Sequence, residues 1–180
     1  MHQVYSQMQI GQGKHGMITL NQYHEEILNL LGVTQPEHIE RGKAIIEQEE
    51  NRIQIFAGVK DTLHDLKRRG YLLGIVTDTA QSVSTKLAWF GKAGFGEVWD
   101  AIIASNEVGI QKPAPAIYQA ALDQLGVKAS QAVFVGHKTS ELEGARGVGL
   151  RTIAFNYDDT AQADYYIGKF ADLLQLPVIS

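Results

Sequence analysis

The chain of 180 residues contains no cysteine. This absence excludes disulfide scaffolds, cysteine-based zinc sites, iron–sulfur clusters and cysteine nucleophiles. The formal net charge is −4, so no basic excess predicts a nucleic-acid partner or an anionic membrane surface. No apolar run approaches the roughly 20 residues that span a bilayer, and the first residues lack the basic-then-apolar order of a signal peptide. We therefore expect a cytoplasmic protein with no nucleic-acid partner and no membrane partner.

Hydrophobic residues make up 44% of the chain, which is typical of a globular domain. After Gly58, short apolar runs alternate with segments of helical periodicity, which predicts a mostly parallel sheet covered by helices. The run from Tyr71 to Val76 is apolar throughout, as in a strand buried on both faces. The predicted strands are residues 71–76, 101–104, 131–135, 151–155 and 164–167, and the predicted helices of this part are 59–69, 82–92, 115–125, 140–148 and 169–174.

The part of the chain before residue 56 differs from the rest in composition and in predicted secondary structure. Residues 1–18 are polar and glycine-rich, and two helices are predicted at about 21–31 and 36–52. The charged stretch 47–52 is typical of a solvated helix face. We therefore predict a helical segment over residues 1–55 and an α/β core over residues 56–180.

Polar side chains follow three of the predicted strands. Thr77 and Asp78 follow the first strand, Lys112 lies in the loop after the second, and His137 and Glu141 follow the third. Ligands of open parallel sheets bind at the carboxyl ends of the strands. A hydroxyl beside backbone N–H groups, together with a lysine, is suited to hold a phosphate. The sequence therefore predicts an anion site at this edge.

These segments resemble the haloacid dehalogenase superfamily in their order. Residues 73–78 are similar to its second motif, 109–118 to its lysine segment and 133–149 to its fourth motif, and 163–174 are similar to the end of its core. The resemblance implies a three-layer Rossmann-like core with a helical cap over residues 1–55. It also implies a phosphatase-type hydrolase that acts on a small phosphorylated metabolite through an aspartyl intermediate and uses Mg²⁺. Thr77, Asp78 and Lys112 would bind phosphate, with Lys112 supporting catalysis.

Two departures from the family pattern bear on activity. The first motif, Asp-x-Asp, whose first carboxylate is the nucleophile, is absent from the printed sequence. The fourth motif begins Gly136-His137 instead of Gly-Asp, which leaves Glu141 as a weak candidate metal ligand. We expect this chain to bind Mg²⁺ poorly and to be inactive. The alternative is a non-catalytic module, for binding or structure, that keeps the fold.

The strand that carries the first motif in the family is central, between the strands that end at Thr77 and at Gly136. Without it, these two strands close up directly, pair with residues 1–10, or receive a strand from a partner chain. Val4, Ser6, Met8 and Ile10 alternate with Tyr5, Gln7 and Gln9, a weak pattern for a buried central strand. We expect either direct closure or an opened, poorly stable sheet.

The remaining motifs are weak. Gly11, Gly13 and Gly16 match Gly-x-Gly-x-x-Gly, but no buried strand precedes them and no helix opens at the third glycine, as a dinucleotide site requires. Apart from His137, the histidines (His2, His15, His24, His38 and His64) show no ligand spacing and are predicted to be surface or capping residues. Trp89 and Trp99 are predicted to be core residues.

Overall fold

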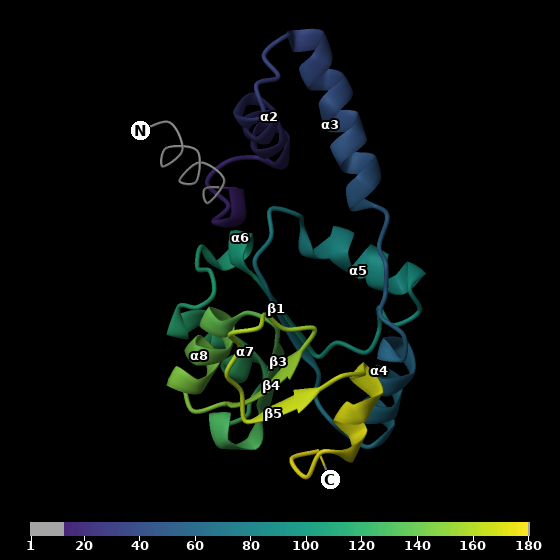
Figure 1. Cartoon of the computed structure of the whole chain (residues 1–180), viewed down its shortest axis with the longest axis vertical. Coiled ribbons are helices and arrows are strands. Elements are labelled where there is room, and N and C mark those ends of the chain that lie inside the picture. Colours follow the sequence, from purple (N-terminus) through teal and green to yellow (C-terminus); the bar gives the residue numbers. More distant parts are fainter. Residues whose placement is uncertain (1–12, 180) are drawn as a thin grey trace.

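The computed structural model describes residues 13–179. Its first two labelled helices, α2 (Leu20–Leu30) and α3 (Pro36–Glu50), pack against each other and stand apart from the sheet (Figure 1). A capping box starts α2, because the Thr19 hydroxyl accepts from the Gln22 N–H and the Gln22 side chain accepts from the Thr19 N–H. A proline in the first turn of α3 suits a helix start. The two helices predicted at about 21–31 and 36–52 are therefore present, each within a residue or two of its predicted limits.

The rest of the described chain alternates strands and helices in the predicted order. The strands are β1 (Gly74–Thr77), β2 (Ala101–Ala104), β3 (Val133–Gly136), β4 (Arg151–Phe155) and β5 (Tyr165–Ile167). The remaining helices are α4 (Val59–Arg68), α5 (Val83–Lys92), α6 (Ser105–Val108), α7 (Pro115–Leu125) and α8 (Thr139–Gly147), with short 3-10 segments η1 (Ala129–Gln131) and η2 (Phe170–Gln175). All recorded strand pairs are parallel. None of the helices described is long and apolar enough to cross a membrane.

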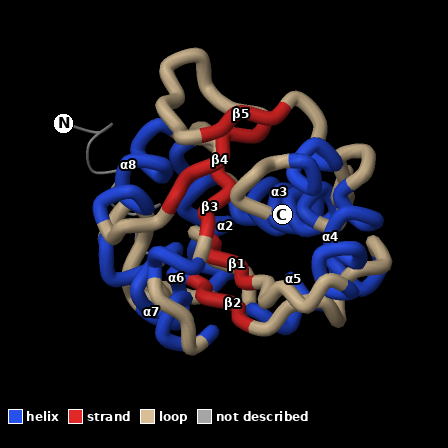
Figure 2. Tube along the Cα trace, turned by 90° about the horizontal axis from the view of Figure 1, so that it is seen from below, coloured by secondary structure: helices blue, strands red, loops and turns tan. Residues whose placement is uncertain are grey.

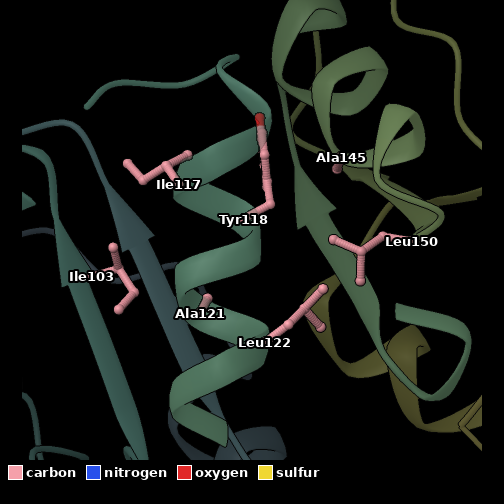
Figure 3. Packing of buried hydrophobic residues seen from close by; sticks show 7 residues of the cluster. All are labelled: Ile103, Ile117, Tyr118, Ala121, Leu122, Ala145 and Leu150. Carbon is pink, nitrogen blue, oxygen red and sulfur yellow. The ribbon is translucent and has the colours of Figure 1, made fainter. Parts of the chain in front are cut away.

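Helices cover both faces of the strands (Figure 2). On one face, α7 and α8 pack with β2 through a buried cluster that includes Ile103, Tyr118, Leu122 and Ala145 (Figure 3). On the other face, Leu66 of α4 packs with the β4 and β5 side chains and with η2. These faces make the predicted three-layer α/β architecture.

The sheet is interrupted in the described chain. β1 pairs with β2, and β3 pairs with β4, which pairs with β5, so β1 and β3 share no hydrogen bonds. Figure 2 shows the strands in the order β5, β4, β3, β1, β2. Direct closure of the two strands is therefore wrong, and the sheet is open among the described residues. The expected low stability of such a sheet stays a prediction. The alternative that invoked residues 1–10 lies outside the described residues.

The prediction of a strand from Tyr71, buried on both faces, is wrong in two respects. The strand begins at Gly74, because the Leu73 N–H donates to Asp100 Oδ2 (2.7 Å) and not to a neighbouring strand. Gly74 is exposed and the other β1 residues are only half-buried, because the described chain places a strand on one side alone. The third strand begins at Val133, two residues later than predicted, because residues 129–131 form η1.

Polar contacts join the pair α2–α3 to the core. The prediction of His24 as a surface residue is wrong, because it is 5% exposed and its Nε2 lies 3.2 Å from Glu50 Oε2. Glu50 in turn accepts from Gln81 Nε2 in the loop after β1, so it does not belong to a purely solvated face. Trp89 of α5 donates from Nε1 to Asn51 Oδ1 (2.8 Å) at the same junction.

Candidate functional site

The carboxyl ends of β1 and β3 meet the loop that follows β2. Lys112 Nζ lies 3.2 Å from Glu141 Oε1, and both side chains are mostly buried, 11% and 8% exposed. Glu141 is in the first turn of α8, directly after β3. The structure therefore brings two of the predicted residues together as a buried ion pair. The low local dielectric strengthens the attraction between their charges.

Asp78 holds the lysine loop by its backbone. Its Oδ1 accepts a hydrogen bond from the Lys112 N–H at 3.0 Å, across 34 positions of sequence. Sequence reasoning placed Asp78 at the site as a phosphate contact and missed this bond, which orients the backbone that carries Lys112. An Asp that directly follows a strand was the available signal, but spacing alone does not tell which backbone group it binds.

His137 and Thr77 lie at the same edge with different surroundings. His137 Nδ1 is 3.8 Å from Glu141 Oε2, and its side chain is 47% exposed. Thr77 is the last residue of β1, in register with Ala104 of β2, and is half-buried. Residues 77, 78, 112, 137 and 141 thus come to one edge from three segments of the chain, as the strand-end argument predicts.

Two further titratable residues adjoin this edge and were not predicted. Tyr118 of α7 donates from its hydroxyl to the Glu141 carbonyl oxygen (2.8 Å), and burial, followed by the charges of Glu141 and Asp78, raises the pKa of its hydroxyl above the ordinary value. Burial lowers the pKa of Lys86 on α5, Glu50 opposes that shift and Lys112 adds to it. Two lysines are therefore close enough for their charges to interact here.

A cavity of ≈ 590 Å³ runs from this edge into the gap between β1 and β3. Lys112, His137 and Glu141 line it at the carboxyl end of the strands, and apolar side chains line the rest. Trp99 is also part of its wall, with a buried indole Nε1 that has no recorded hydrogen-bond partner in the described chain. The site is therefore the polar mouth of a largely apolar cavity.

The side chains at this mouth do not suit Mg²⁺, which takes oxygen ligands in octahedral geometry. The carboxylate of Glu141 is paired with a lysine, that of Asp78 accepts a backbone N–H, and His137 offers nitrogen. No group of three or more acidic or histidine side chains that could hold a metal is found among residues 13–179.

Comparisons with known proteins show which sequences this chain is similar to. Residues 5–155 match the sequence model of a family described as haloacid dehalogenase-like hydrolase. The chain is 30% identical over 129 residues to phosphoglycolate phosphatase of Pectobacterium atrosepticum, covering 68% of this chain and 54% of that protein. It is 31% identical over 123 residues to glyceraldehyde 3-phosphate phosphatase of Pyrococcus furiosus, covering 67% of this chain and 50% of that protein.

Solved structures show the same fold. CbbY from Rhodobacter sphaeroides in complex with phosphate superposes with a TM-score of 0.62 at 29% identity, covering 83% of this chain and 74% of that one. A dehalogenase with an intermediate complex gives a TM-score of 0.71 at 22% identity, over 88% of this chain and 72% of that one. The chain spans about half the length of the two phosphatases to which it is similar.

Proposed function

Because the chain belongs to the haloacid dehalogenase-like hydrolase family, we propose that it carries the anion-binding part of a phosphatase-type site for a small phosphorylated metabolite. The observation that carries this proposal is the buried Lys112, held by the Asp78 carboxylate at its backbone and by Glu141 at its ammonium group. A fixed, desolvated cation at the carboxyl edge of a parallel sheet is suited to bind a phosphate oxygen. The relatives named as phosphatases support the substrate class.

Each residue has a separate role in this proposal. The Lys112 ammonium contacts the anion, and the Thr77 hydroxyl and the backbone N–H groups after it donate to other phosphate oxygens. Asp78 positions the lysine loop. Residues 1–55 act as a cap segment and residues 56–180 as the core, in a cytoplasmic protein.

The chain alone lacks the group that attacks phosphorus. Its 180 residues contain no Asp-x-Asp, and Lys112 can orient and neutralise a phosphate but cannot form an aspartyl intermediate. We therefore expect no hydrolysis from this chain by itself, and a partner segment that supplies the first core strand would have to bring the nucleophile. A non-catalytic binding module is the second candidate, and the position of His137 after Gly136 favours it.

Phosphatases of this family generally use Mg²⁺, but for this chain we propose no step through a metal. Glu141 would have to leave Lys112 before it could bind one, and His137 supplies nitrogen where Mg²⁺ prefers oxygen. The binding proposed here depends on Lys112 and backbone donors.

Calorimetry with inorganic phosphate at low salt tests the proposal. We expect Lys112→Ala to weaken phosphate binding about tenfold or more, because it removes a charge-assisted contact. Lys92→Ala, at an exposed lysine at the end of α5, is the matched control and leaves the affinity unchanged. Lys112→Arg keeps the positive charge, so comparing it with Lys112→Ala separates the loss of the charge from a loss of the fold. Equal affinity in all variants would reject the site.

Turnover of para-nitrophenyl phosphate separates the two candidates. We expect no release of nitrophenol by the purified chain, because the nucleophile is absent. Activity that persists through purification and disappears in Lys112→Ala would contradict this expectation and would establish catalysis by the chain itself.

A further inference from the structure

Three polar side chains from different elements meet where α3 ends. His24 of α2 lies with its Nε2 3.2 Å from Glu50 Oε2, and the same oxygen accepts a hydrogen bond from Gln81 Nε2. His24 is buried, and the Glu50 side chain is 30% exposed. Figure 1 shows α5 between α3 and the strands, so the end of α3 is the end nearer to the core. One oxygen atom of Glu50 therefore joins the helical pair α2–α3 to the loop after β1.

Local helix chemistry disfavours a carboxylate at the position of Glu50. The helix α3 ends at this residue without a basic residue in its last turn, and the C-terminal end of a helix carries partial negative charge. Glu49, in the same turn, is more exposed and pairs with Arg52 at 2.9 Å. Residues that conflict with their own element are expected at functional positions. The contact with the loop, and not the helix, therefore explains a carboxylate at Glu50.

The loop that this carboxylate contacts also carries groups of the proposed phosphate site. The Gln81 N–H donates to Thr79 Oγ1 (2.9 Å), and the Thr79 N–H donates to Ser105 Oγ (3.0 Å). Asp78, at the start of the loop, accepts from the Lys112 N–H (3.0 Å). Gln81 and Asp78 are three residues apart, so a displacement at one end of the loop reaches the other through the backbone and these hydrogen bonds.

We propose that Glu50 is a positioning residue of the anion site, which through Gln81 holds the loop after β1 in the conformation that binds phosphate. The inference rests on the proposed function, because it concerns the affinity of that same site. Glu50 does not contact the anion, since two negative charges repel each other. Coupling between two sites is reciprocal, so a bound phosphate also holds the helical pair α2–α3 against the core.

The charge of Glu50 alone would have the opposite effect on phosphate binding. Burial lowers the pKa of Lys86, the charge of Glu50 opposes that shift and the charge of Lys112 adds to it, so the charges of both residues reach this region. A negative charge near an anion site weakens binding by repulsion. Removal of Glu50 therefore strengthens phosphate binding if only its charge matters, and weakens binding if Glu50 positions the loop.

Calorimetry of the full chain with inorganic phosphate measures the sign of this change. We expect Glu50→Ala to weaken phosphate binding about fivefold or more. Glu50→Gln removes the charge but keeps an oxygen that can accept from Gln81, so its affinity should equal or exceed that of the wild type. Glu49→Ala removes the same charge from the same turn and is the matched control, which should not weaken binding. Weaker binding in Glu49→Ala and Glu50→Ala alike would overturn the proposal.

A second substitution tests whether Glu50 acts through Gln81. We expect Gln81→Ala to weaken phosphate binding as Glu50→Ala does, and the double variant to bind no more weakly than either single variant, because all three lack the same contact. Additive losses would overturn the proposal. Without phosphate, the amides of residues 79–81 should exchange hydrogen faster in Glu50→Ala than in Glu49→Ala, and equal exchange would also overturn it.

The outcomes separate this inference from the proposed function. Phosphate binding that Lys112→Ala weakens, and that Glu50→Ala leaves unchanged or strengthens, overturns the inference and keeps the phosphate site. Binding that neither substitution changes rejects the site and the inference together. Circular dichroism establishes that each variant is folded at the temperature of the titration. If Glu50→Ala is unfolded there, Gln81→Ala gives the same comparison, because it leaves the pair of His24 and Glu50 in place.

Discussion

The Lys112–Glu141 pair makes each residue necessary to the other. Because both side chains are mostly buried, removal of one partner leaves an uncompensated charge that costs about 3–5 kcal/mol. Any cation that competes for Glu141 must also displace Lys112. The pair therefore decides how the mouth of the cavity responds to metals.

We predict that millimolar MgCl₂ leaves the melting temperature of the chain unchanged to within about 1 °C. A ligand that binds only the native state would raise it by mass action, and the ion-paired Glu141 offers no free carboxylate for such binding. The measurement is a thermal scan with and without the salt, with NaCl at equal ionic strength as the control. A rise lost in Glu141→Gln would contradict the prediction.

A second carboxylate, that of Asp164, makes the free energy of unfolding depend on pH. Its Oδ2 accepts from the Thr152 N–H (2.7 Å) and the Thr152 hydroxyl (2.9 Å), and these bonds hold the pKa of Asp164 below its usual range. A lowered pKa in the folded state stabilises the fold above the unfolded pKa, and this contribution is lost as pH falls through the folded value.

We therefore expect Asp164→Asn to lower the free energy of unfolding at pH 7, with a difference from wild type that narrows as pH falls from about 5 toward 2. Urea unfolding at several pH values measures it. Asp159→Asn, at an exposed carboxylate, is the control. A difference that widens in acid would mean that the hydrogen bonds to Thr152 do not stabilise the charged form.

Sequence reasoning succeeded at the residues that follow strands and failed at residues whose role depends on a distant helix. Lys112 and Glu141 could be placed at one edge because parallel strands end together. His24 and Glu50 could not be paired, because each looks like a polar position on an amphipathic helix. Their contact depends on how α2 and α3 cross, which no spacing in the sequence specifies.

At the scale of elements, α8 lies close to the lysine loop because of a glycine. A Cβ on Gly144 would lie 2.5 Å from the Pro113 oxygen and 2.8 Å from Pro113 Cβ, whereas one on Gly147 would meet nothing within 4 Å. The helix and the loop therefore approach each other at one position where no side chain fits.

We predict that Gly144→Ala lowers the free energy of unfolding by about 1–3 kcal/mol, since the backbone of the loop must move. Gly147→Ala, in the last turn of the same helix, should be neutral or stabilising by up to about 1 kcal/mol. Denaturant unfolding of both variants gives the comparison. Similar changes in the free energy of unfolding for the two variants would show that the loop moves without a loss of stability.

An apolar run in the sequence does not by itself give the correct limits of a strand. The run from Tyr71 predicted a strand of the correct type and place, but its first three residues lie before β1 because Asp100 binds the Leu73 backbone. β4 matched its predicted bounds, Arg151–Phe155, because it is paired on both sides and its interior is buried. The limits of β2 and β4 were therefore predicted correctly, whereas β1 and β3, the two strands beside the interruption, begin later than predicted.

At the scale of the whole molecule, helix packing and not strand pairing joins the two parts of the sheet among residues 13–179. Leu122 of α7 is 4% exposed and belongs to the buried cluster that contains Ile103 of β2 and Leu150 before β4 (Figure 3). Since β1 and β3 share no hydrogen bonds, this packing must carry the cohesion that a continuous ladder would provide.

We predict that Leu122→Ala lowers the free energy of unfolding by about 2–5 kcal/mol, through lost burial and the space left behind. Leu31→Ala, at a side chain that is 74% exposed, should change it by less than about 0.5 kcal/mol. Chemical denaturation followed by circular dichroism measures both. Equal changes in the free energy of unfolding for the two variants would show that the cluster around Leu122 does not hold the two parts of the sheet together.

The two tryptophans of the chain lie in different regions, so the fluorescence of each reports on its own surroundings. Trp89 donates to Asn51 where the helical pair meets the core, and Trp99 lines the cavity with its indole nitrogen buried. An indole without a hydrogen-bond partner in apolar surroundings emits at shorter wavelength than one in polar contact. In a Trp89→Phe variant, the remaining fluorophore is therefore a built-in optical probe of the space between the two strand groups.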